Sequence, residues 1–136
     1  MKLDKFTKAV LIAISLIAII AYMDKLEYPQ SFWGYSILLG LIVAVVYYQF
    51  RKDKSEALAI FLAFYIMLIF GLEDLIFYIL DGGIPASMPH LNNHQIIGRI
   101  AMFMNLTTVT PISLIISVAI GGLITYLVVK YLKEKW

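Results

Sequence analysis

Two adjacent acidic residues, Glu73 and Asp74, lie inside the apolar stretch 57–80 and are the only charged residues in it. A carboxylate within a membrane span is energetically costly, and where one occurs it usually has a function. Such a pair can ligate a metal ion, or it can transfer protons as a general acid and base. The alternative is a structural anchor that is hydrogen-bonded to another helix, since polar groups also fix helix packing in lipid.

A tyrosine and a third acidic residue extend this candidate site. On a continuous helix Asp74, Tyr78 and Asp81 share one stripe, whereas Glu73 lies about 100° away on the neighbouring face. We therefore take Glu73, Asp74 and Tyr78 as the candidate catalytic residues.

The two histidines of the chain, His90 and His94, follow shortly afterwards. On a helix this spacing places both imidazoles on one face, as in other helical metal sites. Glu73, Asp74 and Asp81 are the candidate ligands that would complete the shell around a divalent metal ion. The alternative is that the histidines cap helix ends or contact lipid headgroups.

A single cation, Arg99, follows the histidines within the same loop. Charges inside membranes tend to pair, so we expect Arg99 either to form a structural ion pair with Glu73 or Asp74, or to bind a lipid phosphate or another anion. The first outcome would weaken the hypothesis of a functional site.

Four apolar stretches must position these residues: 6–22, 32–50, 57–80 and 111–132. The chain is 62% hydrophobic and 15% charged, whereas a soluble domain carries roughly 25% charged residues. Each stretch approaches the length of about 20 residues that crosses a bilayer as a helix. We expect an all-α integral membrane protein, a four-transmembrane-helix bundle that forms a single domain over residues 1–136. The third loop, 81–110, should combine an irregular segment with an interfacial helix over 95–105.

The basic residues divide unevenly between the loops. Nine of the eleven flank the first, second and fourth stretches on one side: Lys2, Lys5, Lys8, Arg51, Lys52, Lys54, Lys130, Lys133 and Lys135. The positive-inside rule then predicts a multi-pass protein of the cell membrane with both termini in the cytoplasm. We expect 6–22 to be a retained span, because no small-residue cleavage site follows it. Glu73, about 24 Å along a continuous helix from Ala57, would lie in the outer third of the membrane.

Small and turn-forming residues predict where helices end and pack. Asp81-Gly82-Gly83 is typical of a helix end, and Thr110-Pro111 of a helix start. Gly71 allows close helix approach. A stripe of small residues recurs every fourth position in the last span, at Ser113, Ser117, Gly121 and Thr125. This stripe predicts packing within the bundle, with a second copy of the chain or with another membrane subunit.

Three functional hypotheses follow. The first is a membrane enzyme, metal-dependent or acid–base, with an outward-facing polar site that acts on a lipid-like substrate. The second is a non-catalytic structural or accessory subunit of a larger membrane complex. The third is an ion or proton carrier. A net charge of +2 gives no reason to expect nucleic acid, and without cysteine the chain has no thiol chemistry. The Lys- and Ile-rich composition is typical of small, uncharacterised prokaryotic membrane proteins.

Overall fold

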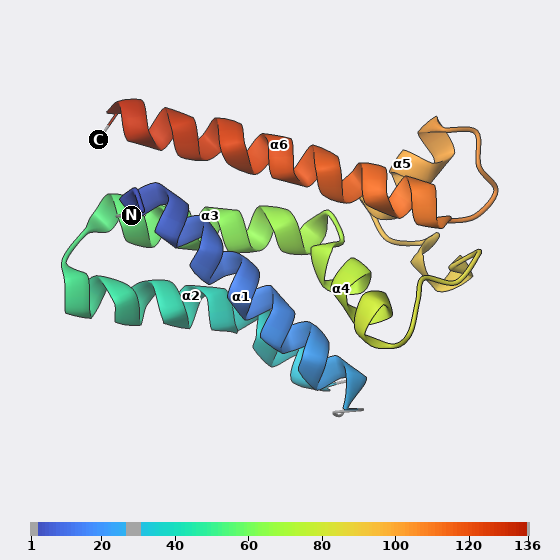
Figure 1. Cartoon of the computed structure of the whole chain (residues 1–136), viewed down its shortest axis with the longest axis horizontal. Helices are drawn as coiled ribbons and strands as arrows, with labels where there is room; N and C mark the ends of the chain where they lie inside the picture. Colours follow the sequence, from blue (N-terminus) through green and yellow to red (C-terminus); the bar gives the residue numbers. More distant parts are fainter. Residues whose placement is uncertain (1–2, 27–30, 136) are drawn as a thin grey trace.

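The computed structural model describes residues 3–26 and 31–135, and the side chains of residues 31–37 lie outside this description (Figure 1). The described ranges are mainly helical and contain no strand. The elements are α1 (Lys5–Lys25), α2 (Ser31–Arg51), α3 (Lys54–Ile69), α4 (Leu72–Leu80), the short 3-10 helix η1 (Pro89–Leu91), α5 (Ile97–Phe103) and α6 (Pro111–Lys135).

Helix α3 is the centre of the bundle. Helices α1, α2 and α6 each pack against it, and α4 turns away from its end to contact α1 (Figure 1). This position explains why α3 is apolar on every side, since a helix that is hydrophobic all round is a buried one. Four of its side chains are fully buried: Ala59, Ile60, Ala63 and Phe64.

Two helices, α1 and α6, are long and apolar enough to cross a membrane. The pair α3 and α4 meets the same test together, but its two halves are bent by 67°. The apolar part of α2 for which side chains are described, Leu38–Arg51, is shorter. Within the described residues, two helices thus have the length and composition of membrane spans, or three spans do if the bent pair is one of them, as expected of a membrane protein.

The predicted continuous helix over 57–80 is wrong. Helix α3 ends at Ile69, Gly71 has a left-handed φ of +100°, and α4 starts in a new direction at Leu72. The axial distance of about 24 Å from Ala57 to Glu73 therefore does not describe this molecule, because Glu73 lies beyond the bend.

Both helix-end predictions are confirmed. Helix α6 begins at Pro111, where Thr110 Oγ1 accepts from Ser113 N at 3.3 Å and Ser113 Oγ accepts from Thr110 N at 2.9 Å. This reciprocal pair satisfies two backbone N–H groups near the helix start. Helix α4 ends at Leu80, and Gly83 N donates to Tyr78 O at 2.9 Å across the following glycine turn.

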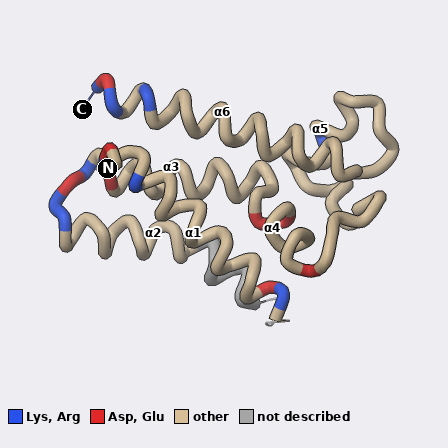
Figure 2. Tube along the Cα trace, in the orientation of Figure 1, with Lys and Arg blue, Asp and Glu red and all other residues tan. Residues whose placement is uncertain are grey.

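The two ends of the bundle differ in charge. Lys and Arg gather where both termini and the α2–α3 turn lie together, while acidic residues of α4 lie toward the opposite end (Figure 2). Ion pairs close the basic end: Lys5 to Asp53 at 3.2 Å and Lys133 to Asp4 at 3.8 Å. The two terminal segments and the α2–α3 turn, which were expected on one side of the membrane, therefore lie at one end of the bundle. Lys2 lies outside the described residues.

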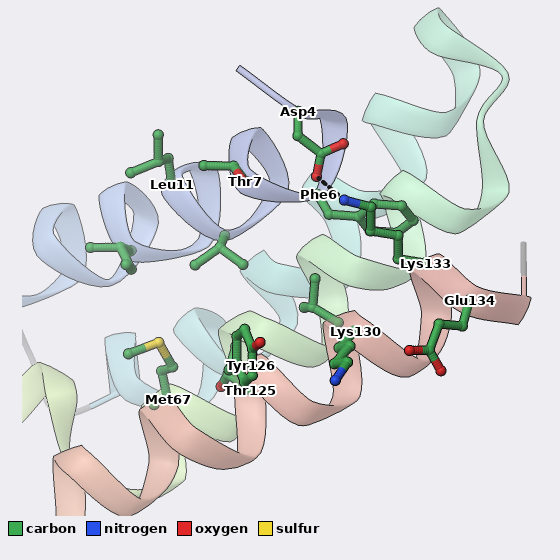
Figure 3. A pocket seen from close by; sticks show the side chains of 14 residues that line it. Asp4, Phe6, Thr7, Leu11, Met67, Thr125, Tyr126, Lys130, Lys133 and Glu134 are labelled. Atoms are coloured by element: carbon green, nitrogen blue, oxygen red, sulfur yellow. Dashed lines mark ion pairs between the residues drawn. The ribbon is translucent and has the colours of Figure 1, made fainter.

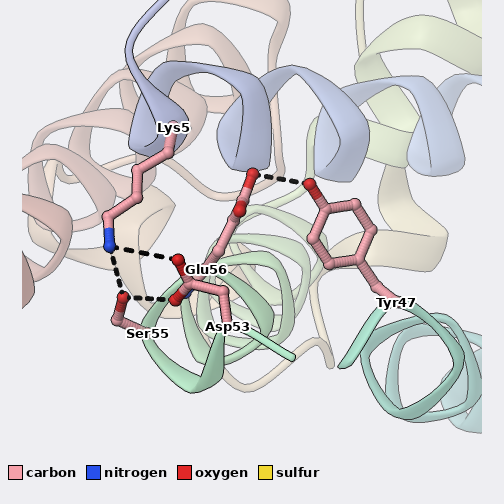
Figure 4. Close-up of polar contacts among 5 residues, drawn as sticks. All are labelled: Lys5, Tyr47, Asp53, Ser55 and Glu56. Carbon is pink, nitrogen blue, oxygen red and sulfur yellow. Dashed lines mark hydrogen bonds and ion pairs between the residues drawn. The ribbon is translucent and has the colours of Figure 1, made fainter. Parts of the chain in front are cut away.

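A polar network at this end holds the start of α3 against α1 (Figure 4). Asp53 caps α3 by accepting from Glu56 N at 3.1 Å, and Ser55 Oγ donates to the same carboxylate at 2.7 Å. Lys5 Nζ donates to both Asp53 and Ser55. Hydrogen bonds from Ser55 and from the Glu56 backbone, together with Lys5, lower the pKa of Asp53 to about 2. The Glu56 side chain is buried, and its carboxylate accepts a hydrogen bond from the Tyr47 hydroxyl at 2.5 Å.

We predict that Asp53→Asn lowers stability by about 1 kcal/mol at neutral pH, because asparagine can still cap α3 but lacks the negative charge that Lys5 and the helix N-terminus stabilise. Because folding depresses this pKa, the stabilisation is present above about pH 4 and is lost as the pH falls toward 2. Thermal unfolding in detergent should show that the stability difference between Asp53→Asn and the unchanged protein shrinks as the pH falls from about 4 toward 2. Glu134→Gln, an exposed change of equal charge, is the control; a difference independent of pH would contradict the prediction.

Candidate functional site

The bend between α3 and α4 creates a polar point inside an apolar bundle. Breaking a helix frees backbone groups, and in lipid these need new partners. One of them, Phe70 O, accepts from the Ser117 hydroxyl of α6 at 2.6 Å. The new helix then starts with Leu75 N donating to Gly71 O at 3.0 Å.

Two glycines let neighbouring elements approach the bend closely. A Cβ on Gly71 would lie 2.8 Å from Ile97 Cδ1 and 3.0 Å from Leu114 Cδ1. A Cβ on Gly121 would lie 2.6 Å from Phe70 Cβ. Close approach at Gly71, expected from the sequence, is thus confirmed.

The small stripe of α6 faces the interior of this chain. All four of its residues are buried: Ser113, Ser117, Gly121 and Thr125. Two of them, Ser117 and Gly121, contact Phe70 directly at the bend. Packing within the bundle, one of the predicted roles of the stripe, is therefore observed.

Glu73 is the most unusual side chain of the site. It lies in the first turn of α4, is 1% exposed, and neither of its carboxyl oxygens has a hydrogen-bond partner among the described residues. A helix N-terminus favours a carboxyl group, but a buried charge without partners remains costly. Across the bundle Glu73 interacts with the carboxyl group of Asp24 on α1, and the structural-anchor alternative stays a prediction.

Two further carboxyl groups act on Glu73. Asp74, its neighbour, is half-buried, and Asp24 near the end of α1 lies close enough to interact with both electrostatically. Helix α1 packs along α4, and Lys25 Nζ donates to Leu80 O at 2.9 Å. Sequence reasoning missed Asp24. The available signal was its position at the end of the first span, on the side of the membrane predicted for Glu73.

Tyr78 and His90, two of the residues predicted for the site, are in contact. The tyrosine hydroxyl lies 2.7 Å from His90 Nε2, on the side of α4 toward the 81–110 connection. Asp81 is the exposed residue that ends α4. Tyr78 also interacts electrostatically with the carboxylates of the site, so the tyrosine lies between them and His90.

The expectation that His90 and His94 share one helix face is wrong, because Pro89–Leu91 is a 3-10 helix that ends before His94. His94 instead caps the start of α5. Its Nδ1 accepts from Ile96 N at 3.3 Å and from Ile97 N at 3.2 Å, and burial lowers the pKa of its imidazole. This is the alternative role that the sequence left open.

Arg99 does not join the carboxylates. It is exposed on α5, next to Met102 and Phe103, and no ion pair links it to Glu73 or Asp74 in the described ranges. The interfacial helix expected over 95–105 corresponds to the shorter α5.

The metal ligands proposed from the sequence are not brought together. In the part of the chain that the structure describes, no group of three or more His, Asp and Glu side chains is arranged to hold a metal ion. What the structure does assemble is a carboxylate site of Glu73, Asp74 and Asp24, with a Tyr78–His90 pair beside it. Neighbouring carboxyl groups repel one another when they are ionised, so such a cluster can hold a proton.

Comparison with known proteins gives no relative: no protein-family model, no curated protein and no solved structure matches this chain. The fold and the site alone therefore define the class of this protein: an all-helical membrane protein with a buried carboxyl group at a helix bend.

We predict that Ser117→Ala destabilises the protein by about 1–2 kcal/mol, because Phe70 O then loses its partner inside the bundle. Thermal unfolding in detergent measures the effect. Ser15→Ala is the matched control, since Ser15 Oγ donates to Leu11 O on the exposed side of α1. Equal losses of stability in the two variants would show that the hydrogen bond at the bend contributes no more than an exposed one.

Proposed function

We propose that this is a membrane protein whose Glu73, supported by Asp74 and Asp24, reversibly binds a proton. The observation that carries the proposal is the 1% exposure of Glu73 with both carboxyl oxygens unpartnered. An ionised carboxyl group in such a place is unfavourable by several kcal/mol unless a proton or a cation neutralises it.

The bend supports this proposal. Membrane proteins that bind ions commonly do so where a helix is interrupted, because the two half-helix ends present free backbone groups and oriented dipoles. Here the interruption is at Gly71, and Glu73 lies two residues beyond it. The nearby donors are carboxylate oxygens, whereas both imidazoles have other partners, Tyr78 and the α5 backbone. This donor set suits a proton.

The enclosure of Glu73 favours a small ligand over a large one. An acid–base enzyme acting on a lipid-like substrate would use the same carboxyl group, but such a substrate must touch it, and only 1% of the side chain is exposed. A proton needs a far smaller opening. An accessory-subunit role, with a partner membrane protein or a second copy, stays a prediction that purification from native membranes would address.

Infrared difference spectroscopy on the protein in lipid bilayers tests the proposal. We predict a pH-dependent carboxylic-acid C=O band that Glu73→Gln removes, because that substitution keeps the shape of the side chain and abolishes its titration. Glu134→Gln, at an exposed position, should leave the band unchanged. If the band responds to added Na⁺ or Ca²⁺ at fixed pH, the ligand includes a cation. An identical spectrum for Glu73→Gln and the unchanged protein would refute the proposal.

We further propose a four-span topology in the cell membrane, with α2 and the bent α3–α4 pair crossing in addition to α1 and α6, and with both termini in the cytoplasm. Supporting this, α2 is helical for 21 residues, and the termini lie at the same end as the α2–α3 turn (Figure 1). That end carries most of the Lys and Arg residues, as a cytoplasmic side does (Figure 2).

Single-cysteine labelling checks this topology cleanly, because the chain has no cysteine of its own. In intact cells a membrane-impermeant maleimide should label Ser87→Cys, in the connection between α4 and α6. It should label Lys54→Cys, at the basic end, only after lysis. Labelling of both positions from the same side would exclude the proposed topology.

A further inference from the structure

A groove of about 780 Å³ runs between α1 and α6, away from Glu73 (Figure 3). Its walls are mainly apolar, formed by one stripe of each helix, and Met67 of α3 also lines it. Helices α1 and α6 both pack on α3, which leaves this space between them (Figure 1). On α6 the wall includes Gly122, where an added Cβ would meet no atom within 4 Å.

The groove is charged at one end. Asp4 and Lys133 form an exposed ion pair there, with Lys130 and Glu134 beside it on α6 (Figure 3). Lys130 makes no ion pair with any described residue. Around this end the described chain carries eight basic residues and four acidic ones, so the local field is positive. The basic residues are Lys5, Lys8, Arg51, Lys52, Lys54, Lys130, Lys133 and Lys135, and the acidic ones are Asp4, Asp53, Glu56 and Glu134.

A polar group inside the groove also lacks a protein partner. Thr125 lines the groove, is 3% exposed, and its Oγ1 makes no hydrogen bond. It lies five residues from Lys130 along α6, about 7.5 Å deeper in the groove. Because the hydroxyl oxygen itself is buried, Thr125 forms a closed part of the wall at the depth that an acyl chain would occupy.

The length of the groove matches one leaflet. On α1 it extends from Asp4 to Ile14, and on α6 from Gly122 to Glu134. At 1.5 Å per residue these segments are about 15–18 Å long. Half of a hydrocarbon core about 30 Å thick is about 15 Å. The groove therefore reaches from the membrane surface to the midplane, as an acyl chain does.

We propose that this groove binds one anionic phospholipid from the leaflet at the basic end of the bundle. One acyl chain lies between α1 and α6 over Met67. The phosphate contacts Lys130 at the charged end of the groove. The field of the basic end favours an anionic lipid over a zwitterionic one.

Native mass spectrometry of the delipidated protein with dioleoyl phosphatidylglycerol or dioleoyl phosphatidylcholine tests this site. We expect the first lipid to saturate at one molecule per chain at a lower concentration than the second. Lys130→Gln should weaken binding of the anionic lipid about fivefold, the scale for one lysine near an anionic membrane surface. Lys54→Gln removes the same charge from the same end outside the groove and should have less effect.

A second variant fills the groove. Gly122→Leu projects into open space and should abolish the one-to-one complex at concentrations that saturate the unchanged protein. Ala119→Leu, at an exposed position of α6 outside the groove, is its control. Equal affinity for the two lipids, or equal effects of Lys130→Gln and Lys54→Gln, would overturn the proposal. Both of these outcomes can be measured even if Gly122→Leu does not fold.

Discussion

The hydrogen bond from the Ser117 hydroxyl to Phe70 O is the interaction on which the rest of this structure depends. It satisfies a backbone carbonyl that the end of α3 leaves free, in a setting where water is not there to do so. Because the hydroxyl comes from α6, the same bond draws that helix against α3. Its neighbour on the stripe, Gly121, has no side chain to keep the helices apart. The bend, the α3–α6 contact and the location of Glu73 are therefore parts of one arrangement.

The bend also determines what surrounds Glu73. A straight helix would have continued along the bundle axis, with its acidic pair at the end of a span. The turn of 67° instead lays α4 against the last part of α1, and so brings Asp24 to the pair. The 81–110 connection packs on the other side. Met88 N donates to Val109 O at 2.8 Å, and Asn92 Oδ1 accepts from Val109 N at 2.8 Å, so this connection is a folded layer rather than an open loop.

Local signals in the sequence predicted helix ends well and the site only in part. Thr110-Pro111 and Gly82-Gly83 act through their own backbone chemistry, so the start of α6 and the end of α4 could be predicted. The break at Gly71 could not, because one glycine in an apolar run costs about 1 kcal/mol and does not by itself stop a helix. Its positive φ goes with contacts to Ile97 and Leu114, which are distant in sequence. The role of Asp24 could not be predicted for the same reason, because it meets Glu73 only through a contact distant in sequence. The spacing of the two histidines was misleading because a 3-10 helix begins at Pro89 and ends before His94.

Helix α3 separates two buried carboxyl groups, Glu56 at its start and Glu73 beyond its end, and Tyr65 is the only polar side chain between Ala57 and Ile69. Helix α3 therefore offers no chain of polar side chains that would link Glu73 to the basic end of the bundle. Under the proposed function, Glu73 would exchange its proton with one side of the membrane without any movement of the helices. To carry its ligand across, the protein would have to redirect α4 relative to α3. Gly71, the residue of this segment already in a left-handed conformation, is the natural hinge for that movement.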